Sequence, residues 1–402
     1  MREWLSDLFR DRAWWMNGAM VFCAFMTFVY MPWDIFWKPV AHDQEVWFGV
    51  MFTGWWAKLT AIPHWIVYGA GFHGLRRRKY WMGVAGAIYV GQIAIGMFLW
   101  PILQYGSLLG LVLGVIAAIP FALLTMAFWN ARDFFERGAP SLRERYGEWA
   151  LVTGASSGIG REFARALAAE QVNCVLTARR ADRLEALEAE LTRQHGVKVR
   201  CVAADLAEPD ADARIAEAVA DLDIAILVNN AGVGYSGRFD GQAIEPLRDM
   251  IRLNCIAPVA LTSRLLPGMK ARGRGAVIVV GSVSGRQPLP LHAVYSATKA
   301  FDLHFGEALY VELRGSGVDA LVVEPGATQT EFSDVAGQLA HGGETPEQVV
   351  AVALSALGGQ PSVVSGWWNW VRASLAARIG SRALVAYVAR GVMAGQTPAE
   401  KL

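Results

Sequence analysis

Charge is scarce in the first third of this 402-residue chain. Residues 13–129 hold nine charged side chains, whereas twelve of the sixteen tryptophans lie before residue 130 and none lies between 150 and 366. With 54% hydrophobic and 18% charged residues, the chain is too apolar for an ordinary soluble enzyme. This uneven distribution predicts a membrane region at residues 1–129 and a globular remainder.

Other absences exclude further classes. The net charge of +1 gives no basic field that would favour nucleic acid. The four cysteines form no C-x-x-C or zinc spacing, so we expect reduced structural thiols and no metal site. His292 and His304 have no cysteine or carboxylate partners at ligand spacing. The cysteines are Cys23, Cys174, Cys201 and Cys255.

Four apolar stretches are candidates for membrane spans. Three carry no charge and are 20 residues or longer, at 13–33, 81–100 and 107–129, which is enough for a helix to cross the hydrocarbon. The fourth, 46–72, carries Lys58 at its middle. Two interpretations stay open for Lys58: it snorkels from a helix near one interface, or it belongs to a polar site inside the bundle.

The charges between the spans predict the orientation. The five segments before, between and after the expected spans are alternately rich and poor in basic residues, beginning and ending with a rich one. This alternation indicates four spans with both ends in the cytoplasm. The excess of arginine over lysine suggests a bacterial source, hence a multi-pass protein of the bacterial cytoplasmic membrane with a cytoplasmic catalytic domain. The basic residues are Arg2, Arg10 and Arg12; Lys38; Arg76, Arg77, Arg78 and Lys79; and Arg132, Arg137, Arg143 and Arg145.

The remainder predicts an α/β fold with a doubly wound parallel sheet. A polar linker at 130–147 precedes a region, 148–360, in which short apolar runs alternate with helical patterns. We expect strands at 150–153, 173–177, 199–203, 224–228, 275–280 and 320–323. Helices are expected at 160–170, 181–195, 211–219, 245–266 and 293–314. Residues 361–402 form a basic, amphipathic tail.

Two motifs in this region indicate hydride-transfer chemistry. Gly154, Gly158 and Gly160 make a turn from a strand to a helix, so a dinucleotide pyrophosphate can bind backbone N–H groups at the helix N-terminus. Tyr295 and Lys299 are four residues apart, so they share one face of a helix. There the lysine ammonium can stabilise the phenolate and make the tyrosine a proton donor or acceptor.

The end of the second strand bears on the cofactor. It reads Leu176-Thr177-Ala178-Arg179-Arg180, with arginine where an acidic residue would bind the ribose 2′-OH of NAD. Arg179 can form a bidentate contact with the 2′-phosphate of NADP, so NADP is favoured over NAD. The alternative is a solvated pair of charges at a helix start.

Further motifs follow in a fixed order. They are Asp205-Leu206, Asn229-Asn230-Ala231-Gly232, Asn254, Ser282, the Tyr295–Lys299 pair and Pro325-Gly326. With the glycine turn, they make residues 148 to about 360 resemble a short-chain dehydrogenase/reductase of the most common type. This resemblance implies a Rossmann domain that interconverts a ketone and a secondary alcohol.

The resemblance also implies residue roles. Ser282 holds the substrate oxygen, Tyr295 transfers the proton, Lys299 binds the ribose hydroxyls and lowers the tyrosine pKa, and Asn254 holds a water that links Lys299 to solvent. The 229–232 motif either braces the sheet or holds the adenosine. The implied cofactor-binding residues are Gly154, Ser156, Ser157, Gly158, Ile159, Gly160, Arg179, Asp205, Leu206, Asn230, Ala231, Gly232, Tyr295, Lys299, Pro325, Gly326 and Thr328.

The membrane region suggests a lipophilic ketone or alcohol as substrate. The segment 331–345 could act as a lid, and residues 363–393 combine tryptophans and arginines without an acidic residue, as at an anionic bilayer surface. Alternatively, this stretch is a helix pair that caps the domain or forms a dimer, and a homo-oligomer stays open. A different class of function is a membrane-anchored NADP sensor or scaffold with a vestigial reductase site.

Overall fold

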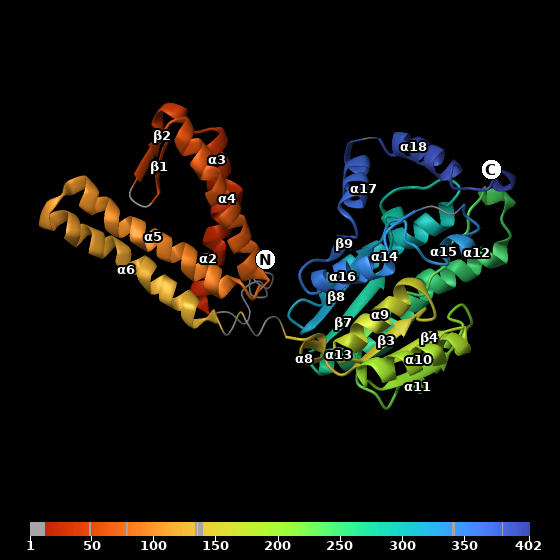
Figure 1. Cartoon of the computed structure of the whole chain (residues 1–402). Helices are drawn as coiled ribbons and strands as arrows, with labels where there is room; N and C mark the ends of the chain where they lie inside the picture. The colour runs from red at the N-terminus through yellow and green to blue at the C-terminus, as the bar shows by residue number, and fades with distance from the viewer. Residues whose placement is uncertain are drawn as a thin grey trace. The chain divides into compact units, whose positions relative to one another are not determined.

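The computed structural model describes residues 13–47, 50–77, 79–132, 135, 140–339, 342–379 and 381–402. The chain divides into two units, Met1–Pro140 and Ser141–Leu402, each considered by itself (Figure 1). The basic residues Arg2, Arg10, Arg12, Arg78 and Arg137, which support the predicted orientation, lie outside the described residues. The four-span topology therefore stays a prediction.

The C-terminal unit contains a parallel sheet of seven strands in the order β5-β4-β3-β6-β7-β8-β9, which confirms the predicted doubly wound fold. The order reverses between β3 and β6, so the carboxyl ends of these strands border the crevice where such sheets bind ligands. The strands are β3 (Trp149–Thr153), β4 (Asn173–Ala178), β5 (Val199–Ala203), β6 (Ile224–Asn229), β7 (Gly275–Val280), β8 (Val318–Glu324) and β9 (Ser362–Val364).

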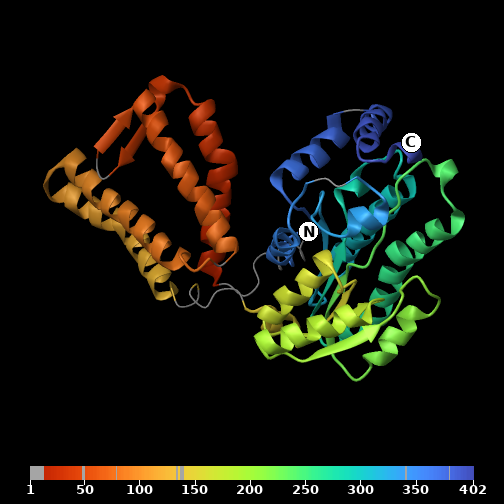
Figure 2. The same ribbon diagram turned by 45° about the vertical axis from the view of Figure 1, so that its right-hand side comes forward.

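Helices cover both faces of this sheet (Figures 1 and 2). Successive strand residues alternate between two buried clusters: Ala150 and Val152 join one, whereas Leu151 joins the other. The first cluster includes side chains of α9 (Gly158–Ala169), α10 (Ala181–His195) and α16 (Pro346–Ala356). The second includes side chains of α11 (Ala211–Ala218), α13 (Ala257–Ala271) and α14 (Ala293–Glu312).

Three segments differ from the sequence-based expectation. Residues 362–364 were assigned to the tail but form β9, which pairs in parallel with β8. Within the expected linker, α8 (Leu142–Tyr146) belongs to the C-terminal unit, because Tyr146 is buried in its core. The helix expected at 245–266 is instead α12 (Ile244–Ile251), a π-helical turn and α13.

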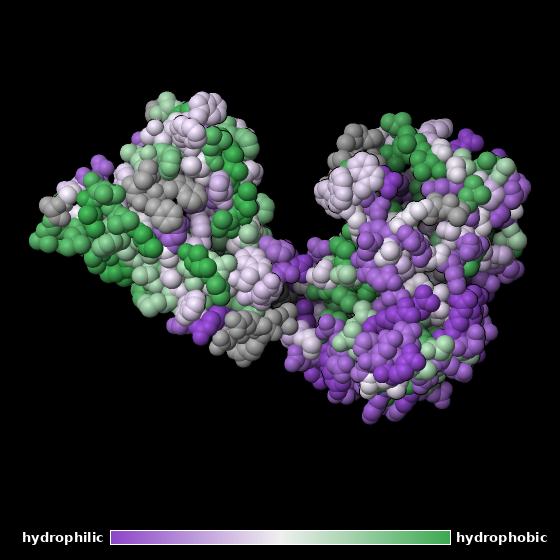
Figure 3. Space-filling model, in the orientation of Figure 1, coloured by the Kyte–Doolittle hydropathy of each residue, from purple (hydrophilic) through white to green (hydrophobic). Residues whose placement is uncertain are grey.

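Among its described residues, the N-terminal unit contains three helical stretches that are long and apolar enough to cross a membrane: Trp14–Phe36, Met82–Tyr105 and Leu108–Asn130. Hydrophobic side chains cover much of the face of this unit that Figure 3 shows. The helices are α2 (Trp14–Phe25), the π-helical turn η1 (Met26–Tyr30), α3 (Met31–Phe36), α4 (Trp55–Arg76), α5 (Met82–Tyr105) and α6 (Ser107–Asn130).

The span expected at 46–72 does not begin where the sequence suggested. The antiparallel strands β1 (Gln44–Trp47) and β2 (Val50–Thr53) occupy its first part, so the unit is not all-α. Helix α4 follows Gly54, whose φ of +63° suits glycine. Besides Pro63, the helix includes the polar residues Lys58, His64, His73 and Arg76. These polar groups explain why α4 falls short of the apolarity of the other three stretches.

Lys58 consequently lies in the first turn of α4 and not at mid-helix. It is 6% exposed, its Nζ lies 3.0 Å from Asp43 Oδ2, and it donates hydrogen bonds to the backbone oxygens of Asp34 and Lys38. Lys38 in turn pairs with both aspartates, at 2.9 Å from Asp34 and 2.6 Å from Asp43. Lys58 therefore joins α3, the hairpin and α4 through a buried ion cluster.

We expect Lys58→Met to lower the free energy of unfolding of the N-terminal unit by about 3 kcal/mol, because Lys38 alone is then left to compensate the two buried carboxylates of the cluster. Thermal unfolding in detergent micelles measures the change, with Lys79→Met, at an exposed position of the same unit, as the control. Equal midpoints for the two variants would contradict a structural role for the cluster.

Candidate active site

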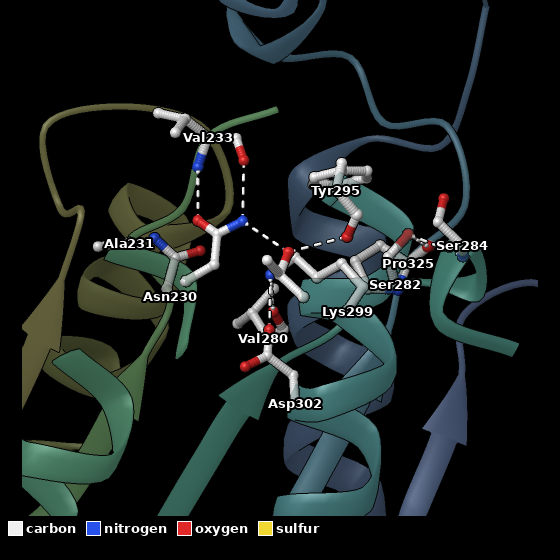
Figure 4. A network of polar contacts seen from close by, with 12 residues as sticks. Asn230, Ala231, Val233, Val280, Ser282, Ser284, Tyr295, Lys299, Asp302 and Pro325 are labelled. Carbon is white, nitrogen blue, oxygen red and sulfur yellow. Dashed lines mark hydrogen bonds and ion pairs between the residues drawn. The ribbon is translucent and has the colours of Figure 1, made fainter. Parts of the chain in front are cut away.

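Helix α14 brings the predicted tyrosine and lysine into one buried site (Figure 4). Lys299 Nζ donates a hydrogen bond to Val280 O at the end of β7, at 2.9 Å. It also pairs with Asp302 Oδ2 at 2.9 Å, one turn further along the helix. The ammonium is therefore held in place from two sides.

Asn254 lies on the π-helical turn η4 (Arg252–Ile256) that separates α12 from α13. Its side-chain amide accepts a hydrogen bond from Val233 N at 3.0 Å and donates to Val233 O at 2.9 Å. It also donates to Thr298 Oγ1 at 3.0 Å, beside Lys299 on α14. A turn of this kind often marks a functional position, since it redirects one side chain within a helix. The predicted water beside Asn254 stays a prediction.

Ser282 follows β7, as the sequence predicted. Its hydroxyl donates a hydrogen bond to Pro325 O at 3.4 Å and accepts one from Ser284 N at 3.1 Å. Burial raises the pKa of the Tyr295 phenol, and the nearby hydroxyl of Ser282 opposes this change. Ser284 contacts this network through its backbone, so Ser282 is the serine whose hydroxyl faces the tyrosine.

The pKa of Tyr295 is set by opposing effects. Burial raises it, whereas the charge of Lys299 and the interaction with Ser282 lower it. The net direction is upward, because burial is the largest of these effects. Lys299 thus acts in the predicted direction, but it does not bring the tyrosine pKa below its ordinary value in this structure.

Asp302 is a site residue that the sequence analysis missed. Burial lowers the pKa of Lys299, but the charges of Asp302 and Tyr295 outweigh it, so this pKa is raised. Burial also raises the pKa of Asp302, while Lys299 opposes that change. The signal was present in the sequence: an acidic residue three positions after the lysine shares its helix face.

A second missed pair joins the loops that flank the site. Arg286 forms a bidentate contact with Glu324, with both distances at 2.6 Å, and Glu324 is fully buried. Glu324 immediately precedes Pro325-Gly326, and Arg286 lies four residues after Ser282. This pair therefore fixes the serine loop to the segment with the predicted cofactor-binding residues Pro325 and Gly326, and it raises the pKa of Arg286.

The glycine turn packs so closely against its neighbours that it has no space for a side chain. Gly154 has a φ of +67°, and a Cβ at this position would approach Asn230 Nδ2 to 2.7 Å. At Gly160 a Cβ would meet both Asn230 and the Gly154 backbone. The turn leads into α9, whose N-terminal N–H groups can receive an anionic group.

The two open roles of the 229–232 motif divide between its residues. Asn229 Nδ2 donates to Thr262 Oγ1 at 3.1 Å, and Asn230 Nδ2 donates to Thr153 O at 2.8 Å. Thr153 Oγ1 accepts hydrogen bonds from Asn230 N and Ala231 N, both at 2.9 Å. Asn229 therefore braces the sheet, Ala231 and Gly232 line the cavity beside it, and Asn230 does both.

The two arginines after β4 have different surroundings. Arg179 is 67% exposed in its side chain, and its closest acidic partner is Asp205 at 3.8 Å. Arg180 instead donates to Ser156 Oγ and Ser157 Oγ, both at 3.0 Å, and pairs with Glu331 at 2.8 Å. Arg180 is therefore the arginine directed at the glycine turn, although the sequence analysis chose Arg179.

All of the predicted site residues except Gly160 and Asn254 line one cavity of about 1050 Å³. The cavity continues past Tyr295 to Phe332 of α15 (Phe332–Ala336), whose ring centroid lies 5.4 Å from that of Tyr295. His292, which is buried and contacts Gln338, also lines it. Its far end is formed by α17 (Trp367–Ile379) and α18 (Arg382–Ala394).

Residues 148–338 match the short chain dehydrogenase family. The very-long-chain 3-oxoacyl-CoA reductase of Anas platyrhynchos is 33% identical over 242 residues, which cover 57% of this chain and 77% of that protein. The chain belongs to the short-chain dehydrogenase family. It is thus an oxidoreductase of the class that the sequence predicted.

Two more relatives in this family have the same name. The very-long-chain 3-oxoacyl-CoA reductase of Phaeosphaeria nodorum is 38% identical over 218 residues, covering 53% of this chain and 64% of its own length. The human protein is 36% identical over 193 residues, covering 47% and 62%. This short-chain dehydrogenase thus spans less than two thirds of those two relatives.

Solved structures agree in fold. A 7beta-hydroxysteroid dehydrogenase superposes with a TM-score of 0.59 at 30% identity, covering 62% of this chain and 99% of that one. A short-chain dehydrogenase from Sphingobium yanoikuyae in complex with NADPH gives a TM-score of 0.51 at 36% identity, covering 54% and 87%. Both comparisons support the Rossmann fold of the C-terminal unit.

Proposed function

We propose that this protein is a membrane-bound, NADP(H)-dependent oxidoreductase that interconverts a ketone and a secondary alcohol on a lipophilic substrate. The relatives named for very-long-chain 3-oxoacyl-CoA reduction support a long-chain 3-oxoacyl thioester as the substrate. The observation that carries the proposal is one cavity, which joins the tyrosine–lysine–serine site to the apolar side chains of α17 and α18.

The cavity suits a dinucleotide with a 2′-phosphate. The glycine turn and the start of α9 line the cavity where the pyrophosphate would bind, and Arg180 with Ser156 can receive the phosphate on the ribose. Lys299, Pro325 and Gly326 also line the cavity, where Lys299 would bind the ribose of the nicotinamide and the other two would border the nicotinamide ring. When bound, NADPH supplies a hydride to the carbonyl carbon.

The side chains of this protein then orient the carbonyl oxygen and protonate it. Ser282 Oγ donates a hydrogen bond to the carbonyl oxygen and orients it towards Tyr295. Tyr295 gives its phenolic proton to that oxygen as negative charge develops there. Lys299 stabilises the resulting phenolate, and the hydrogen-bond network through Thr298 and Asn254 lies next to this pair.

A chain-length series tests the substrate assignment. The full chain, reconstituted in lipid nanodiscs, is assayed for NADPH oxidation with 3-oxoacyl-CoA thioesters of increasing length and with a short, water-soluble ketone. We expect kcat/KM to rise with chain length, because each buried methylene contributes about 0.8 kcal/mol. Equal turnover of short and long substrates would contradict the assignment of a lipophilic substrate. If none of these substrates supports NADPH oxidation, the result would favour the alternative of an NADP sensor.

We predict that Asp302→Asn moves the pH dependence of reduction. The carboxylate of Asp302 raises the pKa of both Tyr295 and Lys299, so its loss lowers both. Reduction needs the phenolic proton and the ammonium, so activity is lost as pH rises through these pKa values. The basic limb of the kcat/KM profile should therefore shift to lower pH in the variant.

Asp182→Asn, at an exposed position on α10, is the matched control for this profile. It should reproduce the parent curve. A basic limb of Asp302→Asn that superimposes on the parent would contradict the electrostatic role of Asp302.

We predict that Arg180→Ala weakens NADPH binding by about 30-fold, because it removes a charged partner of the 2′-phosphate. Binding of NADH, which lacks this phosphate, should change little. Titration of the intrinsic nicotinamide fluorescence measures both dissociation constants. Arg179→Ala is the matched control, and a larger loss of NADPH affinity in that variant would restore the assignment made from the sequence.

A further inference from the structure

The last two helices turn an apolar face towards the cavity. Leu384, Val388 and Val392 recur every four residues along α18, and all three line the cavity. They are nevertheless 55–62% exposed, so the cavity opens to the outside along this row. Figure 3 shows hydrophobic residues over α18. The opening of the active site is therefore rimmed by aliphatic side chains.

The helix pair is attached to the site at both ends. At the start of α17, Asn369 Nδ2 donates to Ser365 O at 3.0 Å and to Glu344 Oε2 at 3.2 Å, and its side chain fills the space over Gly326. After α18, Gln396 O accepts a hydrogen bond from Leu339 N at 3.0 Å. Residues 326 and 339 flank α15, the helix that carries Phe332. A displacement of α17 and α18 would therefore also move α15.

The outer surface of the pair has the composition of a bilayer-binding helix. Trp367, Trp368 and Trp370 are 73%, 54% and 55% exposed, and Arg382 and Arg390 are exposed on α18. Between Glu347 and Glu400 the chain has no acidic residue. Exposed tryptophans favour the headgroup level, and uncompensated arginines favour anionic lipids.

We propose that α17 and α18 dock on an anionic bilayer surface and form the portal through which the acyl chain passes from the lipid into the cavity. This inference rests on the proposed lipophilic substrate. Two features of the molecule favour a lipid surface as the occupant. The part of the chain that the structure describes includes three helical stretches long and apolar enough to cross a membrane. The rim of aliphatic side chains also offers lipid tails a continuous apolar path.

The test uses the full chain in nanodiscs of phosphatidylcholine alone or mixed with phosphatidylglycerol. Hydrogen exchange of peptides from residues 367–394 reports the docking. We expect slower exchange in the anionic nanodiscs, and the difference should fade at high salt, because headgroup attraction is screened. Exchange that is equal in both lipids would overturn the proposal, as would protection that depends on protein concentration, which would indicate a second copy on this surface.

A charge variant links docking to substrate entry. The double variant Arg382→Gln/Arg390→Gln should raise KM for the long-chain substrate about tenfold in anionic nanodiscs, given the attraction of each arginine to the surface. The short, water-soluble ketone should be turned over as before. The control is Arg193→Gln/Arg274→Gln, which removes the same charge at two other exposed positions. Equal KM values for the two double variants would refute the portal.

The two measurements also separate this inference from the proposed function. If ketones of every length are left unreduced while lipid-dependent protection of α17 and α18 persists, the proposed reaction fails and the docking surface stands. If long chains are reduced without any effect of lipid charge on exchange or KM, the reaction stands and the portal fails.

Discussion

Tyr295→Phe should lower kcat/KM for ketone reduction by about 10³-fold, within the range that a positioned general acid contributes. The variant keeps the ring, which packs against Phe332, and removes the hydroxyl that interacts with Lys299 and Ser282. The proton for the developing alkoxide would then have to come from water. Steady-state NADPH oxidation with the preferred chain length measures the loss.

A matched control is Tyr235→Phe, which removes the same hydroxyl at a tyrosine that does not line the cavity. NADPH affinity should be close to the parent value in both variants, since the phenol is a small part of the cofactor site. If Tyr295→Phe retains parental turnover, tyrosine is not the acid. That result would favour a protein that binds the dinucleotide without reducing a ketone.

The arrangement of the sheet and the order of the motifs could be predicted from the sequence, because each depends on local patterns. Buried parallel strands read as short apolar runs, and Tyr295 and Lys299 share a helix face wherever that helix is formed. The strands at 199–203 and 275–280 and the helix at 181–195 have the predicted boundaries in the structure. Three residues of β9 are too few to give such a pattern.

Other features depend on contacts between segments distant in sequence. From the sequence, Lys58 was expected in the middle of an apolar span. Its partner Asp43 precedes a β-hairpin that the apolar character of residues 46–53 did not indicate. The contacts of Arg180 with Ser156 and Glu331 are 24 and 151 residues away, so nothing in the local sequence ranked it above Arg179. Glu324 and Arg286 are 38 residues apart for the same reason.

The second large effect concerns the buried ammonium. Lys299→Met should reduce kcat/KM by about 100-fold, because the phenolate that forms during reduction loses its neighbouring positive charge. It should also lower the free energy of unfolding by about 3–5 kcal/mol, since Asp302 is left as a buried, unpaired carboxylate. Either loss alone could be ascribed to misfolding, so the single variant does not separate chemistry from stability.

The double variant Lys299→Met/Asp302→Leu separates them. Replacing both members of a buried pair by apolar residues of similar size removes the unpaired charge, so stability should return to near the parental value. Activity should not return, because the phenolate still lacks its ammonium. Thermal unfolding and NADPH oxidation, measured on the parent, the single variant and the double variant, give the two readouts. Recovery of turnover together with stability would mean that Lys299 is a structural residue, and that proton transfer by Tyr295 proceeds without it.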